Sequence, residues 1–482
     1  MASQLALPAA ELVSRGESLQ AHRLIAAVLL LATVCLVSPA RGRASVAPGF
    51  TDSVVLSGAT QPTTVRFGPH GSAYVAEKSG RILYYKSFGA PPRLVADLST
   101  EVYDSGDHGL LGLALDPRFS TRPYLYVLYT YDAPIGGTAP TWGTPGMLQD
   151  TCPTPPGANV DGCVTSGRLS RLTLSGNHFK SERVLINDWC NQFTTHSVGD
   201  LQFGSDGSLY ASGGDGAKVS PDYGQYGSPN NPCGDPPGGV GGSMSPPGAE
   251  GGSLRSQDLT TAGDPVGLDG SLIRVSPTTG QGVAGNPLAS SSDPNARRIL
   301  AEGLRNPFRF ALQPGTGEIW VGDVGFSTWE EIERLPSHSS QFVDFGWPCY
   351  EGASQQPAWA SLGLTVCSNL YGAGTATPPY FAYNHASSVV SGDGCPTTHS
   401  AIAGLAFPTA YAAPYAHALF FSDFSRGCVW AMLPDSSGTP DPGDVVPVVT
   451  GAAGPVDLEV GPGGDLYYVA IADGTVHRLH QG

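Results

Sequence analysis

Among the residues of this chain that could do chemistry, His196 and Asp215 stand out because of the segment between them. This segment is predicted to form a β-hairpin: Leu201 and Phe203 alternate with polar residues, and residues 204–207 supply the turn. His196 lies eight residues before the turn and Asp215 eight after it, so the two side chains are expected to meet where the hairpin ends. A carboxylate fixes the tautomer of a neighbouring imidazole and raises its basicity, as a general base requires. The alternative is a surface histidine and a turn aspartate.

A second hairpin, over residues 310–321, places further functional groups. Arg305 lies nine residues before its turn and Gly325 lies eight after it, with Asn306 next to Arg305. If the two hairpins are related by rotation around one axis, these residues share the hairpin end that carries His196. A base, a carboxylate, a guanidinium and a backbone amide would then line one pocket.

The elements that must position these residues are repeats of the same hairpin. Six copies occur, at 65–75, 111–129, 201–211, 310–321, 402–421 and 458–469. Short strands with Gly/Pro turns and no helical periodicity are typical of a β-propeller, so we predict an all-β fold with six blades. A β-sandwich and a β-helix are the alternatives. Residues 132–166 and 219–262 are expected to be long loop insertions because they are rich in loop-forming residues.

The composition narrows the possible functions. The chain has 482 residues with 64 Gly and 42 Pro, only 14% of them are charged, and the net charge is −16. An acidic chain is a poor candidate for binding nucleic acid, because the phosphate backbone demands clustered Lys and Arg.

Residues 1–45 have the pattern of a targeting segment. Arg15 and Arg23 precede an apolar run, 24–37, and small residues follow it. The run is shorter than a comfortable membrane span, so we expect a signal peptide or, given the long stretch before it, a signal anchor. Residues 46–482 then form one propeller domain without a stable membrane span after signal cleavage, in a secreted, extracellular or periplasmic protein.

The cysteines fit that compartment. Cys35 lies in the apolar run, which leaves eight of the nine for the domain. No Cys-x-x-Cys pair occurs, so disulfides are expected in preference to a zinc site. Neighbours along the chain suggest four pairs, although eight cysteines allow many other connectivities. The suggested pairs are Cys152–Cys163, Cys190–Cys233, Cys349–Cys367 and Cys395–Cys428.

Several longer motifs, in a fixed order, give the chain a recognisable resemblance. They are HGLLGLALDPRF at 108–119, the His196 hairpin, GLRNPFRF at 303–310, WVGDVG at 320–325, FGWPCYEG at 345–352 and LFFSDF at 419–424. With these motifs the sequence resembles the glucose/sorbosone dehydrogenase family, the soluble PQQ-dependent sugar dehydrogenases and their relatives. The resemblance implies a six-bladed propeller that oxidises the anomeric hydroxyl of sugars, with the quinone PQQ bound over the channel mouth.

The resemblance also implies roles for the residues of the pocket. His196 would take the hydroxyl proton, Asp215 would orient it, and Arg305 with Asn306 would bind the quinone oxygens. Hydride leaves carbon more easily as the oxygen loses its proton, and a guanidinium stabilises the charge that the quinone gains.

Further expected contacts rest on the same resemblance. The backbone carbonyls of Gly325 and Phe326 would hold Ca²⁺, a hard cation that prefers oxygen ligands. His108 stands, with the residue before it, where the family usually has a polar pair that includes Gln, and we expect it at the cofactor. Arg426 is expected to meet a cofactor carboxylate in place of a family Lys near Ser425.

Together these observations predict a secreted quinoprotein oxidoreductase that acts on a sugar or related polyol and passes electrons to an external acceptor. One alternative is a non-catalytic extracellular propeller that binds a protein or glycan, since residues 454–457 lack two Arg residues that the family has there. The other is a lactonase-like hydrolase in which a metal activates water.

Overall fold

In this computed structural model the chain is described at residues 44–144, 146–225, 233, 245–261, 265–337 and 341–482. Nearly all of the expected targeting segment at 1–45 therefore lies outside the described residues. No helix within the described ranges is long and apolar enough to cross a membrane.

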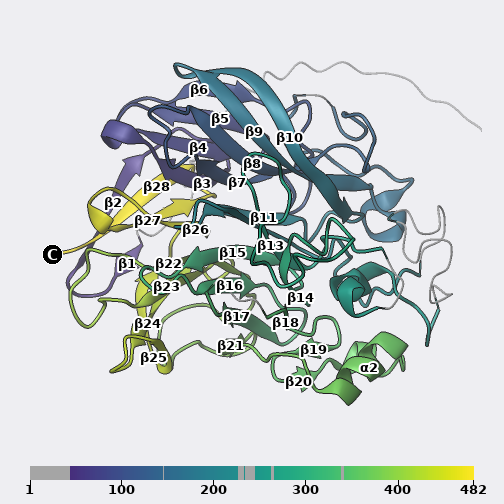
Figure 1. Ribbon diagram of the computed structural model, residues 1–482. Helices are drawn as coiled ribbons and strands as arrows, with labels where there is room; N and C mark the ends of the chain where they lie inside the picture. Colours follow the sequence, from purple (N-terminus) through teal and green to yellow (C-terminus); the bar gives the residue numbers. More distant parts are fainter. Residues whose placement is uncertain (1–43, 145, 226–232, 234–244, 262–264, 338–340) are drawn as a thin grey trace, which may run out of the picture. The chain divides into compact units, whose positions relative to one another are not determined.

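The described residues form six blades of at least four strands each (Figure 1). The first three blades are β3 (Pro62–Phe67), β4 (Ala73–Glu77), β5 (Arg81–Tyr85) and β6 (Arg93–Asp97); β7 (Leu110–Leu115), β8 (Tyr124–Tyr131), β9 (Thr165–Ser175) and β10 (His178–Asn191); and β11 (Val198–Phe203), β12 (Leu209–Gly213), β13 (Ser271–Val275) and β14 (Ile299–Glu302), which β18 (Val343–Asp344) extends. The other three are β15 (Pro307–Leu312), β16 (Ile319–Asp323), β17 (Trp329–Leu335) and β21 (Phe381–Asn384); β22 (Ile402–Ala406), β23 (Leu419–Asp423), β24 (Cys428–Pro434) and β25 (Pro440–Thr450), which β1 (Ser45–Val46) extends; and β26 (Pro455–Val460), β27 (Leu466–Ala470), β28 (Thr475–Gln481) and β2 (Phe50–Leu56).

The six hairpins predicted from the sequence are the first two strands of the six blades, which confirms the propeller. The first strands, β3, β7, β11, β15, β22 and β26, contact one another in a closed ring. Each therefore lies at the centre, and each blade runs outward from it, as expected for this fold.

The ring is closed by strands from both ends of the described chain. β2 pairs antiparallel with β28, so that Phe50 lies opposite Gln481. Figure 1 shows this purple strand beside the yellow C-terminal strands. The last blade therefore combines one early strand with three late ones.

The hydrophobic core is divided between the blades. One apolar cluster fills each of the six interfaces between neighbouring blades; Leu113 and Tyr129, for example, pack with Tyr74 and Ile82 of the preceding blade. Both faces of each inner sheet are thus buried, which explains why β4, β12 and β27 are buried along their whole length.

The two predicted insertions are largely loop where they are described. The first contains the short π-helix η2 (Gly157–Asp161), and the second contains the 3-10 helix η4 (Gly252–Thr260); residues 226–232, 234–244 and 262 of the second lie outside the described residues. A third excursion, after β18, was not predicted. It holds the hairpin β19 (Tyr350–Glu351) and β20 (Ser354–Gln355) and the helices α1 (Pro357–Ala360) and α2 (Thr365–Ala373).

All four suggested disulfides are present: Cys152–Cys163, Cys190–Cys233, Cys349–Cys367 and Cys395–Cys428. The third ties α2 to the loop before β19, and the fourth ties the loop after β21 to β24.

Candidate active site

The His196–Asp215 pair forms as the hairpin arithmetic predicts. Val198 of β11 lies opposite Gly213 of β12, and His196 and Asp215 lie two residues beyond this pair on the two strands. Nδ1 of His196 is 2.8 Å from Oδ1 of Asp215. Because Nδ1 faces the carboxylate, Nε2 is the ring nitrogen left to a ligand.

Asp215 is fully buried but well supplied with donors. Oδ1 also accepts from the backbone N–H of Ala217 at 2.9 Å, and Oδ2 accepts from Nε1 of Trp347 at 2.8 Å. Burial alone would raise the pKa of this carboxyl, but His196, Arg305 and the backbone N–H of Ala217 hold it below its usual value. Asp215 is therefore a carboxylate that holds the imidazole in one orientation.

The backbone of His196 is held in an unusual conformation. Its φ of 55° lies in the left-handed region that non-glycine residues rarely adopt. The backbone N–H of His196 donates to Oδ2 of Asp107 at 2.9 Å, and the N–H of Gly216 donates to its carbonyl at 3.0 Å. Such strain persists where surrounding contacts over-determine it, often at functional sites.

Arg305 and Gly325 extend the register of the next blade in the same way, two residues beyond the pair Pro307 and Asp323. One terminal nitrogen of Arg305 donates to the carbonyls of Val324 and Gly325, at 2.8 and 2.7 Å. The backbone carbonyl of Arg305 accepts from the N–H of Asp215 at 2.9 Å. The two blade ends are therefore joined directly, and the guanidinium lies beside the His–Asp pair.

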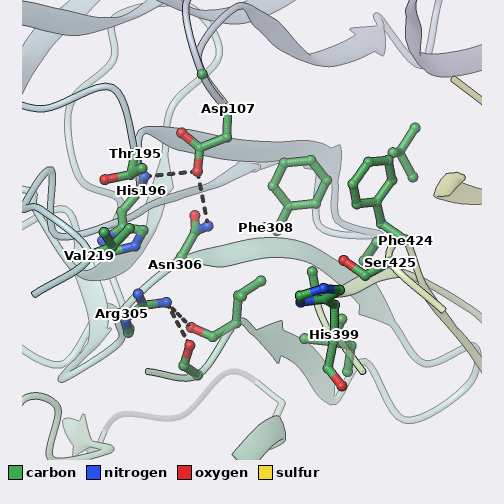
Figure 2. A pocket seen from close by; sticks show the side chains of 18 of the residues that line it. Asp107, Thr195, His196, Val219, Arg305, Asn306, Phe308, His399, Phe424 and Ser425 are labelled. Atoms are coloured by element: carbon green, nitrogen blue, oxygen red, sulfur yellow. Dashed lines mark hydrogen bonds between the residues drawn. The ribbon is translucent and has the colours of Figure 1, made fainter. Parts of the chain in front are cut away.

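His196, Arg305 and Gly325 line a cavity of about 630 Å³ at the centre of the ring, and Asp215 is buried behind His196. Every blade contributes to its lining, since Thr63, Leu111, Phe308, Ile402 and Val456 come from the first strands of five blades and His196 lies two residues before that of the sixth. Figure 2 shows His196, Arg305 and Asn306 on one side, with Phe424, Ser425 and His399 across from them.

His108 and Arg426 do not reach this cavity, contrary to the sequence-based expectation. His108 is completely buried behind the lining, where burial lowers its pKa to about 4, and Asp107 lines the cavity in its place. The guanidinium of Arg426 is also buried and donates to the carbonyls of Asn384 and Ser387 and to Oγ of Ser400. Both residues therefore support the wall and are not available as direct ligands.

Gly325 and Phe326 line the cavity, but the donor set around them does not fit a divalent cation. The Gly325 carbonyl already accepts from the Arg305 guanidinium, and a second cation there would be repelled. The Glu351 carboxylate beside them accepts from the backbone N–H groups of residues 326–329. Across the described ranges, no group of three or more His, Cys, Asp or Glu side chains could hold a metal ion.

Several residues of the cavity were missed by the sequence analysis. Lys78 follows β4, so it lies at the same end of its hairpin as His196 does, and the same arithmetic could have found it. Its Nζ donates to the carbonyl of Asp104, and burial lowers its pKa. His385 and His399 come from outside the inner hairpins, in a loop after β21, and no sequence motif marked them.

The fold and site together define a class: six-bladed propellers with a histidine–carboxylate pair and an arginine at the axial cavity. Within that class, the chain belongs to the Glucose / Sorbosone dehydrogenase family, whose sequence model matches residues 59–232 and 251–365, more than half of the chain.

Individual relatives are distant. The chain is 28% identical over 123 residues to quinoprotein glucose dehydrogenase B of Acinetobacter calcoaceticus, which is 23% of this chain and 26% of that protein. It is 21% identical over 390 residues to the HIPL2 protein of Arabidopsis thaliana, 76% of this chain and 50% of that protein. The chain thus spans between a quarter and half of the length of the curated relatives it matches.

Solved structures agree on the fold. The PQQ-bound aldose sugar dehydrogenase of Streptomyces coelicolor superposes with a TM-score of 0.58 and 16% identity, covering 90% of this chain and 99% of that one. The soluble aldose sugar dehydrogenase of Escherichia coli, in its apo-form, gives 0.60 and 18%, covering 90% and 100%.

Proposed function

We propose that the protein is an oxidoreductase that oxidises a hydroxyl group of a sugar or related polyol, with PQQ as the group that accepts the hydride. The observation that carries this proposal is the His196–Asp215 pair at 2.8 Å, with Arg305 beside it in one cavity. The family and the PQQ-bound neighbour support the same choice.

The chain's own residues provide the acid–base part of such a reaction. A substrate hydroxyl that binds within hydrogen-bond distance of Nε2 of His196 gives up its proton there, and Asp215 stabilises the imidazolium that forms. Loss of that proton makes the carbon a better hydride donor, so the two electrons leave with the C–H hydrogen. The positive charge of Arg305 then stabilises the negative charge that develops on the acceptor.

The donor set of the cavity fits a flat, anionic quinone. Arg305 and Asn306 lie next to the base, and the rings of Phe308 and Phe424 supply apolar walls (Figure 2). The second terminal nitrogen of Arg305, Nη2, makes no hydrogen bond to the described part of the chain and would hold a quinone oxygen with Asn306. When bound, PQQ supplies the two-electron acceptor that the side chains lack.

We also propose that the protein works in an oxidising compartment, outside the cell or in a periplasm. Four disulfides in one domain support this, because such bonds persist where thiols are not kept reduced.

The test is to titrate the purified protein with PQQ, with and without Ca²⁺, by difference absorption, and then to measure dye reduction with a panel of aldoses. His196→Ala should abolish turnover, whereas His178→Ala, at an exposed site on the outer strand β10, should not. Equal turnover in both variants would rule out the base. Absence of quinone uptake would favour a non-catalytic binding propeller, and lactone turnover without quinone would favour the hydrolase.

A further inference from the structure

A second histidine–carboxylate pair faces the same cavity. His385 lines it from the loop after β21, and its Nε2 lies 2.7 Å from Oε1 of Glu330. Glu330, on β17, is completely buried, and its other oxygen accepts from the backbone N–H of Ile402 at 2.9 Å. The His385 side chain keeps 23% of its surface exposed, so a buried carboxyl group supports a partly exposed imidazole.

The charges around His385 favour its protonated form. Burial alone would lower the pKa of His385, but the carboxylates of Glu330 and Glu351 raise it above the usual value. Arg426 donates to the carbonyl of His385 at 3.3 Å, and its own charge lies close to Asp423. His385 therefore keeps its proton to a higher pH than an ordinary histidine does.

The wall around His385 is rich in hydrogen-bond donors. His399, Thr398, Ser400 and Ser425 line it together with His385. Oγ of Ser400 accepts from Arg426 at 2.9 and 2.7 Å, which leaves its hydroxyl hydrogen free to donate. A set of hydroxyls and imidazoles around one positive charge recognises an anion.

The apolar residues beside these donors restrict the kind of anion that this wall can bind. Phe424, Ile402 and Val456 lie next to these donors in the lining, and Figure 2 shows the Phe424 ring beside His399 and Ser425. Among the described lining residues, Lys78 and Arg305 are the only Lys or Arg. The wall opposite His196 therefore combines apolar side chains with two histidines that can carry positive charge.

We infer that His385 and His399, with Glu330 as the counter-ion, form a subsite that binds a carboxylate group of the cavity's ligand. This inference rests on the proposed function in its choice of PQQ as the main probe, since that quinone carries three carboxylates. A carboxylated sugar would present the same group, so a uronic acid is the second probe. In both cases the carboxylate lies across the cavity from His196.

The test measures equilibrium binding of PQQ and of glucuronate to the full-length protein by calorimetry, at pH 6 and pH 8.5. His385→Gln and His399→Gln should each weaken binding of the carboxylated probe about tenfold or more, the usual cost of a hydrogen bond to a charged group. His178→Gln is the matched control. Wild-type affinity should fall as the pH rises, because His385 loses its charge, and His385→Gln and Glu330→Gln should lose most of this pH dependence.

The outcomes separate this inference from the proposed function. PQQ binding that is equal in wild type and both histidine variants overturns the subsite and leaves the oxidoreductase proposal standing. Histidine-dependent glucuronate binding without PQQ binding supports the subsite and contradicts PQQ as the cofactor. Absence of binding by either probe overturns the subsite. Circular dichroism checks the fold, and His399→Gln, whose ring makes no hydrogen bond to the described residues, serves if His385→Gln fails to fold.

Discussion

Replacing Asp215 by Asn is the sharpest test of the base, because the side chain keeps its shape while one acceptor becomes a donor. In the wild type all three neighbours donate: Nδ1 of His196 and the N–H of Ala217 to Oδ1, and Nε1 of Trp347 to Oδ2. An Asn side chain has one oxygen, so it cannot satisfy all three.

The two orientations of the Asn amide should cost similar amounts of stability, but they leave His196 in different tautomers. With its NH₂ toward Trp347, the indole N–H is left without an acceptor, and the tautomer of His196 is kept. When the Asn NH₂ faces His196, the N–H of Ala217 loses its acceptor and the proton of the imidazole must move from Nδ1 to Nε2. A protonated Nε2 cannot take the proton of the substrate hydroxyl. Either way, a buried unpaired donor costs about 1–3 kcal/mol of stability. Loss of a positioned general base lowers turnover by about 10²–10⁴-fold.

The assay combines dye-reduction kinetics with ¹⁵N NMR of the imidazole, which reports the tautomer without requiring turnover. Trp347→Phe provides the decisive control, because it removes the indole donor and allows the Asn NH₂ to face the vacated side. The double variant Asp215→Asn/Trp347→Phe should therefore be more active than Asp215→Asn alone. Turnover of Asp215→Asn within twofold of wild type, with an unchanged tautomer, would refute the reasoning.

Three further predictions concern the cavity and its supports. Arg305→Lys should lower kcat about 10²-fold, because one ammonium nitrogen would replace two guanidinium nitrogens, one bound to the carbonyls and one facing the acceptor; an unchanged kcat contradicts this. The double variant Cys395→Ser/Cys428→Ser removes a disulfide of sequence separation 33 and should lower the free energy of unfolding in urea titrations by about 4 kcal/mol. A much smaller loss would show that other contacts hold this loop. Burial raises the pKa of Asp132 to about 7, so the folded state binds this proton more tightly than the unfolded state does. The protonated side chain therefore stabilises the fold at low pH, and this stabilisation is lost as the pH rises from about 4 through 7. The melting temperature of Asp132→Asn should therefore fall less than that of the wild type between pH 5 and pH 8. An equal fall in both proteins would contradict the raised pKa of Asp132.

The parts of this protein that sequence reasoning predicted are those in which local pattern and geometry coincide. A hairpin has a fixed register, so equal or nearly equal arm lengths on either side of its turn were enough to bring His196 to Asp215 and Arg305 to Gly325. The six hairpins predicted the inner strands for the same reason. The disulfides followed chain neighbours because each closes a loop that leaves and returns to one region.

The missed histidines depend on contacts between segments with no shared local pattern, whereas Lys78 lies at a position that the hairpin geometry already defines. His385 and His399 reach the cavity from a loop outside the inner strands, through packing that no repeat encodes. Arg426 was expected at a ligand because it is basic, but backbone carbonyls and Ser400 already use its donors. The helix α2 lacks a side-chain N-cap and ends at Gly374 in the left-handed conformation, so only its C-terminal end carries a strong signal.

The pairing of β2 with β28 has a consequence for how the protein is made. Residues 50–56 leave the ribosome early, but their partner strand, residues 475–481, is synthesised only after the five blades between them. At about 5–20 residues per second, the early strand waits roughly 20–90 s with an unsatisfied edge. During that time it is a template for wrong pairing with other chains. The nascent protein would therefore gain most from a chaperone that covers this one strand until β28 has been synthesised.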